Sequence, residues 1–127
     1  MATMSNVTVI CNPDKLRPLI SAFNALGITG ITVSHVEGCG AQHGFKGYYR
    51  GVENEIQLLP KVKVEVIVSA IPVEKVMEVA TNILDSTEIG AGKIFVYDVE
   101  KVLRVRTKET DFDALQDVPS KTAKDGN

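Results

Sequence analysis

A glycine-lysine turn and a nearby arginine pair are the residues best suited to chemistry in this chain. The turn is Gly90-Ala91-Gly92-Lys93, and the arginines stand in Arg104-Val105-Arg106. Glycines lack a Cβ atom, so backbone N–H groups can converge on an anion, and lysine adds a fixed positive charge. Arginines two residues apart on a strand point to the same face, where both can bind phosphate oxygens. The pattern therefore predicts a phosphate-binding site.

An ordinary turn followed by a solvated strand is the alternative interpretation of the same residues. The turn is not a Walker loop, because that motif needs a glycine at the position held by Thr87. It is not a dinucleotide fingerprint either, since no helix is expected to begin there. Asp98 and Glu100 could neutralise the arginines. Spacing alone leaves both interpretations open.

The composition indicates one compact domain with a real hydrophobic core. The chain has 127 residues, of which 44% are hydrophobic and 24% charged, and its net charge is -2. This charge argues against binding to nucleic acid or anionic lipid by bulk electrostatics. Neither a signal peptide nor a long apolar segment is evident, so we expect a cytoplasmic protein without direct membrane insertion. Cys11 and Cys39 are too few for a disulfide framework.

Apolar periodicity divides the chain into alternating strands and helices. We expect strands at 7–11, 30–36, 62–68, 93–97 and 102–106, with helices at 17–26 and 72–84. Strand, helix, strand, strand, helix, strand is the order of a ferredoxin-like α+β sandwich with both helices on one face of the sheet. Residues 102–106 would add a C-terminal strand. We expect one domain over residues 1–115 and a flexible tail over 116–127.

The connection between the second and third strands is unusually long. Residues 38–56 show no apolar periodicity and are rich in glycine. Connections of this length are uncommon in compact domains and usually have a function. The segment carries exposed-type aromatic and charged residues, among them Tyr48, Tyr49, Arg50 and Glu53. It is therefore expected to contact a partner, and an unstructured hairpin extension is the alternative.

Signals for catalysis or a metal centre are weak. No grouping of serine, histidine and aspartate is evident, and His35, Cys39 and His43 recur every four residues. That spacing would suit metal ligands on a helix, but Gly38 and Gly40 disfavour a helix in this segment. Cys11, on an apolar strand, is more simply a core residue. We expect a protein that is not an enzyme.

Three segments resemble the PII signal-transduction proteins, and the likeness extends from Val7 to about Leu115. Residues 49–53, Tyr-Arg-Gly-Val-Glu, are similar to the family's loop signature. Residues 86–96, Ser-Thr-Glu-Ile-Gly-Ala-Gly-Lys-Ile-Phe-Val, are similar to its second signature. Residues 59–63, Leu-Pro-Lys-Val-Lys, resemble the start of its third strand.

The resemblance implies a homotrimer of ferredoxin-like subunits that binds ATP or ADP in the clefts between them. It implies that phosphates are held by the glycine-lysine turn and by the two arginines, which are Gly90, Ala91, Gly92, Lys93, Arg104 and Arg106. Thr32, Gly38 and Gly40 would lie near the nucleotide. Gln42 would help to coordinate Mg²⁺ with ATP and 2-oxoglutarate, and Lys61 would pair with a carboxylate of 2-oxoglutarate.

The chain departs from the family pattern at several positions. Asn54 stands where many members carry a tyrosine that accepts a nucleotidyl group, so that modification is impossible there. Val52 replaces a serine that is phosphorylated in some relatives, Ala91 replaces an acidic residue, and His43 replaces a lysine. These changes leave covalent control, 2-oxoglutarate sensing and the choice between ATP and ADP open.

The leading hypothesis is a non-catalytic sensor in which the bound nucleotide sets the conformation of residues 38–56. The resemblance implies an ammonium transporter or a nitrogen-metabolism enzyme as the regulated partner, with recruitment to a membrane when the partner is a transporter. The alternatives are a slow Mg²⁺-dependent ATP hydrolase, a PII-like trimer that senses adenine nucleotides only, and a trimer that binds another small molecule or a metal.

Overall fold

The structure, a computed structural model, describes residues 3–39, 57–86 and 91–115. After β1 (Met4–Cys11) come a short 3-10 helix (Pro13–Lys15) and α1 (Leu16–Ala25), then β2 (Ile31–Gly38). The second half contains β3 (Leu59–Val68), α2 (Val73–Leu84), β4 (Gly92–Val99) and the short helix α3 (Asp111–Leu115).

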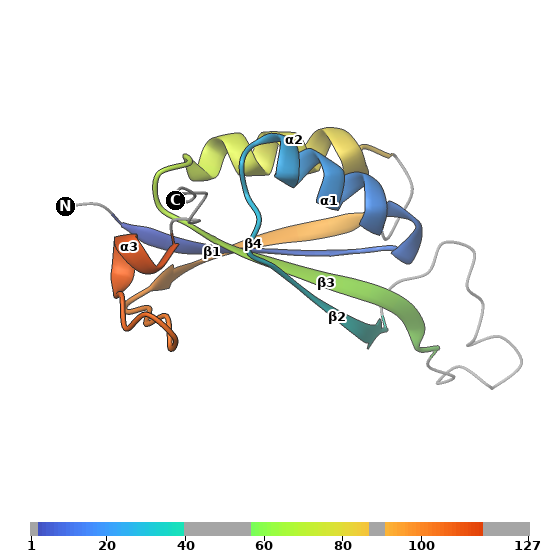
Figure 1. Cartoon of the computed structure of the whole chain (residues 1–127). Helices are drawn as coiled ribbons and strands as arrows, with labels where there is room; N and C mark the ends of the chain where they lie inside the picture. The colour runs from blue at the N-terminus through green and yellow to red at the C-terminus, as the bar shows by residue number, and fades with distance from the viewer. Residues whose placement is uncertain (1–2, 40–56, 87–90, 116–127) are drawn as a thin grey trace, which may run out of the picture.

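Within these ranges, the strands form one four-stranded antiparallel sheet in the order β2-β3-β1-β4. The register places Val9 of β1 opposite Val64 of β3 and Ile94 of β4. Helices α1 and α2 lie together over one face of the sheet (Figure 1). The ferredoxin-like arrangement predicted from the sequence is confirmed.

The core lies between that face and the two helices. Side chains alternate between the faces of a strand, so the valines of β3 point together toward the helices. Val62, Val64 and Val66 are fully buried against Phe23 of α1 and Val76 of α2. Each such valine contributes roughly 1.5–3 kcal/mol by leaving water. This burial makes the sheet a rigid support for groups at its ends.

The opposite face of the sheet is open and chemically mixed. Phe95 and Tyr97 of β4 lie on this face with exposures of 39% and 54%, and their rings stack at a centroid distance of 6.5 Å. Asn6 of β1 donates a hydrogen bond of 3.4 Å to Glu65 of β3 and accepts one of 2.8 Å from Thr8. The open face therefore combines exposed aromatic rings with a polar network.

Residues 102–106 do not form the predicted strand. Leu103 makes an isolated bridge to Thr110, and residues 105–107 form a turn. The hydrogen bonds are local: the Arg104 amide donates to the Glu109 carbonyl at 2.8 Å, and the Asp111 amide donates to the Val102 carbonyl at 2.8 Å. The alternating sequence mimics a strand, but the segment closes on itself. Helix α3 follows, and the sequence did not predict it.

Other predicted boundaries shift by a few residues. Strand β1 begins at Met4, β3 begins at Leu59, and Gly38 ends β2 instead of beginning the loop. The remainder of the predicted loop, residues 40–56, lies outside the described residues, as does the predicted tail at 116–127. None of the described helices combines the length and hydrophobicity that a membrane crossing requires.

Candidate functional site

Gly92 begins β4 and lies against β1, where it pairs with Cys11. Its φ angle is +152°, and a Cβ atom at this position would lie 2.9 Å from the Ile10 carbonyl oxygen and 3.1 Å from Leu84 Cδ1. A side chain here would therefore strain the backbone and collide with backbone atoms. Glycine is required for packing at this position, whatever ligand the turn binds.

Lys93 follows Gly92 and is exposed at the same end of the sheet. It lines a small cavity of about 270 Å³ between the end of α2 and the start of β4. Ala91 and Ser86 also line this cavity, whereas Gly90 lies outside the described residues. The described part of the glycine-lysine turn thus borders a small cavity and carries an exposed lysine.

Lys61 of β3 lies at the same end of the sheet, because Val62 pairs with Cys11 and Cys11 pairs with Gly92. Its Nζ atom donates a hydrogen bond of 2.7 Å to Asn12 Oδ1. Gly38 lies beside it, since a Cβ atom on Gly38 would be 3.5 Å from Lys61 Cγ. The structure therefore places Gly38 beside Lys61, and it places Lys93 at the same end of the sheet but two strands away from Lys61.

A larger cavity lies at the other end of the sheet and has a volume of about 660 Å³. Its walls come from the α1–β2 turn and the start of β2, the end of β3, and residues before and within α3. Thr32 and Arg104 both line it, as do apolar groups such as Ile67 and Ile71. The volume falls within the usual range for small-molecule sites, about 300–1,000 Å³.

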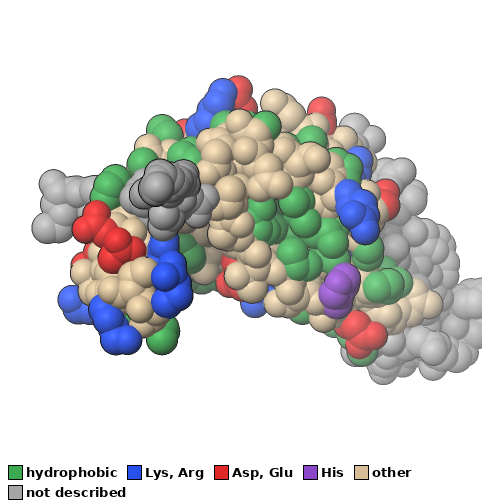
Figure 2. Space-filling model, viewed as in Figure 1, with side chains coloured by type: hydrophobic (Ala, Val, Ile, Leu, Met, Phe, Trp, Pro, Cys, Tyr) green, Lys and Arg blue, Asp and Glu red, His purple; other side chains and the backbone are tan. Residues whose placement is uncertain are grey.

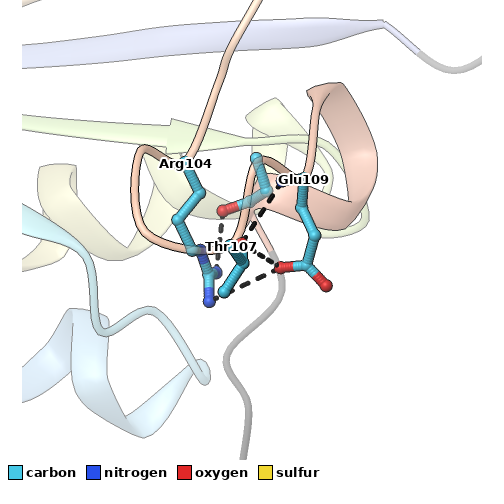
Figure 3. Close-up of polar contacts among 4 residues, drawn as sticks. Arg104, Thr107 and Glu109 are labelled. Carbon is cyan, nitrogen blue, oxygen red and sulfur yellow. Dashed lines mark hydrogen bonds and ion pairs between the residues drawn. The ribbon is translucent and has the colours of Figure 1, made fainter.

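Arg104 is held in place by the C-terminal segment (Figure 3). Its Nη2 atom donates a hydrogen bond of 2.8 Å to the Ala114 carbonyl, and its Nη1 atom lies 3.8 Å from Glu109 Oε1. Figure 2 shows basic and acidic side chains gathered over α3 and the segment before it. Arg106 lies exposed in the turn at 105–107. The prediction that Arg104 and Arg106 share one face of a strand is therefore wrong.

The two candidate regions are far apart within one chain. Lys93 stands near the beginning of β4 and Val99 ends it, and this length of extended strand spans about 20 Å. Arg104 comes after that distant end, near α3 (Figure 1). One chain cannot place Lys93 and Arg104 on the same phosphate group. Contact of both residues with one phosphate group would need a second copy of the chain.

Several predicted residues cannot be placed. Outside the described residues lie Gly40, Gln42, His43, Tyr48, Tyr49, Arg50, Glu53, Asn54 and Gly90. Among the described ones, no group of three or more metal-ligating side chains occurs. His35 lies within β2 and Cys39 just beyond it, so about 13 Å of extended chain separates them.

Sequence patterns did not single out Asn12 or Glu109. Asn12 meets Lys61 only through strand pairing, and the two are 49 positions apart in sequence. Glu109 reaches Arg104 because the segment turns back on itself. No local motif marks either contact.

These observations define a small antiparallel α+β domain of ferredoxin-like fold, with cationic groups at both ends of its sheet. A sequence model described as "Nitrogen regulatory protein P-II" matches residues 4–109. The match covers most of the chain, so the chain belongs to the nitrogen regulatory protein P-II family.

Relatives with known names support this membership. Nitrogen regulatory protein P-II of Pasteurella multocida is 42% identical over 112 residues, which are 88% of this chain and 100% of that protein. Nitrogen regulatory protein GlnK of Escherichia coli K12 is 40% identical over the same shares of the two chains. These relatives are named as regulatory proteins, not as enzymes.

Solved structures agree with the fold. A complex of GlnK from B. subtilis with ATP has a TM-score of 0.75 and 31% sequence identity, and the likeness covers 89% of this chain and 96% of that chain. Another structure of B. subtilis GlnK has a TM-score of 0.76 and 35% identity, with 89% and 99% coverage.

Proposed function

We propose that this protein is a non-catalytic trimeric sensor that binds ATP or ADP between its subunits. Residues 38–56 would report the bound nucleotide to a transporter or a nitrogen-metabolism enzyme. The protein would act in the cytoplasm and reach a membrane only by docking on such a transporter. The family membership supports this general role.

The separation of Lys93 from Arg104 is the observation that carries the proposal. Each group lines its own cavity, at opposite ends of one sheet. A ring of copies can place the Lys93 end of one subunit against the Arg104 end of the next, because head-to-tail contacts close into rings. Each cleft of such a trimer would then contain both half-sites, namely the Lys93 end of one subunit and the Arg104 end of the next.

The larger cavity suits the chemistry of a nucleotide. Ile67 and Ile71 offer apolar surface for a base, and Arg104 offers a planar guanidinium for phosphate oxygens. Thr32 adds a hydroxyl group at the edge of β2. The relation to a GlnK that was solved with ATP supports an adenine nucleotide as the ligand. The other phosphate contacts would come from Gly90, Gly92, Lys93 and Arg106.

The open face of the sheet suits burial between copies. Phe95 and Tyr97 expose large parts of their rings there. Aromatic side chains are enriched in protein interfaces because they bury much area at little entropic cost. The trimer contact would therefore cover this face and align the half-sites.

Lys61 is the proposed partner of a 2-oxoglutarate carboxylate. It lies beside Gly38, where β2 ends and the predicted partner-contacting segment begins. A dianionic ketoacid beside ATP needs cations to offset the repulsion between like charges. Mg²⁺ held by Gln42 together with ATP would supply one of them. Gly40 would lie close to the same group.

Calorimetric titration with ATP and with ADP tests the proposal. We expect one nucleotide per subunit, bound at millimolar concentrations or below. A chain that binds neither nucleotide would contradict the sensor function. Phosphate release from ATP by the purified protein would instead favour a hydrolase.

The role of Lys61 is tested separately with 2-oxoglutarate added to the complex with Mg²⁺ and ATP. Lys61→Ala is expected to weaken 2-oxoglutarate binding at least tenfold, the scale of one lost charge-assisted contact of about 1.5–3 kcal/mol. ATP binding without the ketoacid serves as the control. Equal 2-oxoglutarate affinity in both proteins would show that the assignment is wrong.

A further inference from the structure

Arg104 has an anionic neighbour within its own chain. Its Nη1 atom lies 3.8 Å from Glu109 Oε1, and the two side chains are 24% and 44% exposed. The same guanidinium lines the cavity proposed to receive a nucleotide. Any phosphate that approaches Arg104 therefore meets a carboxylate already beside it.

Thr107 fixes the direction of that carboxylate (Figure 3). The Thr107 hydroxyl donates a hydrogen bond of 2.9 Å to Glu109 Oε1, the oxygen that faces Arg104. The Glu109 amide in turn donates a bond of 3.3 Å to Thr107 Oγ1. The carboxylate is thus oriented by its own turn, before any ligand binds.

Other contacts hold Arg104 independently of the Glu109 side chain. The Ala114 carbonyl accepts a hydrogen bond of 2.8 Å from Nη2. The backbone of Arg104 is fixed by the Glu109 carbonyl at 2.8 Å and by the Lys108 amide at 2.7 Å. Loss of the Glu109 carboxylate would leave all of these in place, so the carboxylate is not needed to position the guanidinium.

We propose that Glu109 competes with phosphate for Arg104 and thereby lowers the nucleotide affinity of the protein. This inference rests on the proposed function, because it assigns a regulator to the same site. A phosphate oxygen and the carboxylate oxygen are both acceptors for the guanidinium N–H groups on one edge. Phosphate that binds at this edge must displace Glu109 or lie beside its negative charge, and either cost is subtracted from the binding free energy.

The variant Glu109→Gln tests the competition. It keeps the size of the side chain and an oxygen for the Thr107 hydroxyl, but it removes the negative charge. We expect ATP to bind roughly two- to fivefold more tightly in calorimetry, the range of an exposed ion pair. Adenosine, which has no phosphate, should bind Glu109→Gln and the unmodified protein equally.

Glu78→Gln is the matched control. Glu78 also forms an exposed ion pair, at 3.7 Å from Lys75, but it lies on α2 and does not line either cavity. Glu78→Gln changes the net charge by the same amount as Glu109→Gln, and it should leave the ATP affinity unchanged. Thr107→Val is a second test variant: it keeps the carboxylate but removes its orienting hydroxyl, and should tighten ATP binding by a smaller factor.

Three results would overturn this inference while leaving the proposed function in place. Weaker ATP binding by Glu109→Gln would show that the carboxylate supports Arg104 instead of competing. A gain equal to that of Glu78→Gln would show a general charge effect, and a gain for adenosine as well would show that phosphate is not involved. Failure of the unmodified protein to bind ATP would instead overturn the proposed function, and this inference with it.

Discussion

Gly92 has two distinct reasons to lack a side chain, and only one of them concerns a ligand. A glycine in a phosphate-binding turn lets backbone N–H groups approach an anion. The structure shows a second reason, because the Ile10 carbonyl of β1 and the Leu84 side chain of α2 occupy the space of a Cβ atom. A loss of function at this position would therefore not by itself prove phosphate binding.

Gly92→Ala should lower the free energy of unfolding by about 2–4 kcal/mol, through backbone strain at positive φ and a collision with β1. Urea denaturation measures this change. Gly30→Ala is the control, because a Cβ atom there meets nothing within 4 Å. It should change stability by no more than about 0.5 kcal/mol. Equal effects of the two substitutions would contradict the packing role of Gly92.

Cys11 predicts a specific pH dependence of stability. Burial raises the pKa of its thiol above the usual value of 9.0, the Asp14 carboxylate adds to the rise, and the ammonium groups of Lys61 and Lys15 oppose it. The folded state therefore retains this proton more strongly than the unfolded state. Its contribution to stability is intact below about pH 9, the usual pKa of the thiol, and declines as the pH rises further.

Urea unfolding between pH 8 and pH 10 tests this contribution. The stability difference between the unmodified protein and Cys11→Ala should shrink as the pH rises, by at most about 1.4 kcal/mol per pH unit. Cys39→Ala is the control, because Cys39 is exposed. A constant difference for Cys11→Ala would contradict the raised pKa.

At the scale of elements, the sequence predicted the strands of the sheet, but it did not predict the segment that folds back on itself through local hydrogen bonds. The alternation in β3 identifies a strand because one face is buried against two helices. The same alternation around Arg104 led to the wrong prediction of a strand. The backbone of Arg104 instead forms hydrogen bonds with residues a few positions further along the chain. Residues with positive φ, Lys108 at 66° and Asp111 at 53°, turn this segment back. Neither is a glycine, so composition did not signal the turn.

Asp111 closes the segment with both its backbone and its side chain. Its amide donates to the Val102 carbonyl at 2.8 Å, and its Oδ1 atom accepts from the Val102 amide at 3.1 Å. Aspartate also tolerates the left-handed backbone better than alanine does. Asp111 therefore fixes the start of α3, whose Ala114 carbonyl holds Arg104.

Asp111→Ala should release this closure locally. We expect hydrogen exchange at the Val102 and Arg104 amides to accelerate about tenfold, the effect of losing roughly 1–2 kcal/mol of local stability. Amides in the centre of β3 should be unaffected. Asp113→Ala, with the same charge change at an exposed position of α3, provides the control. Unchanged exchange in Asp111→Ala would contradict the role of the Asp111 contacts.

At the scale of the whole molecule, the sequence predicted the members of the site better than their arrangement. Motif resemblance selected Lys61, Lys93 and Arg104, which all lie beside cavities or at the ends of the sheet. Spacing along the chain suggested that Arg104 backs the glycine-lysine turn directly. The sheet places them at opposite ends instead, because β4 runs its full length between them. Which residues strand pairing places at the same end of a sheet is not encoded in local sequence.

Subunit complementation tests the central claim, that each nucleotide site combines Lys93 of one copy with Arg104 of the next. Lys93→Ala and Arg104→Ala are expected to weaken ATP binding strongly when each forms a trimer alone. Purified mixed trimers should regain about one high-affinity site each, because one cleft in the ring pairs the two intact residues. Calorimetric ATP titration of the mixed trimers measures this site. Mixed trimers that bind no better than either parent would contradict a site shared between copies.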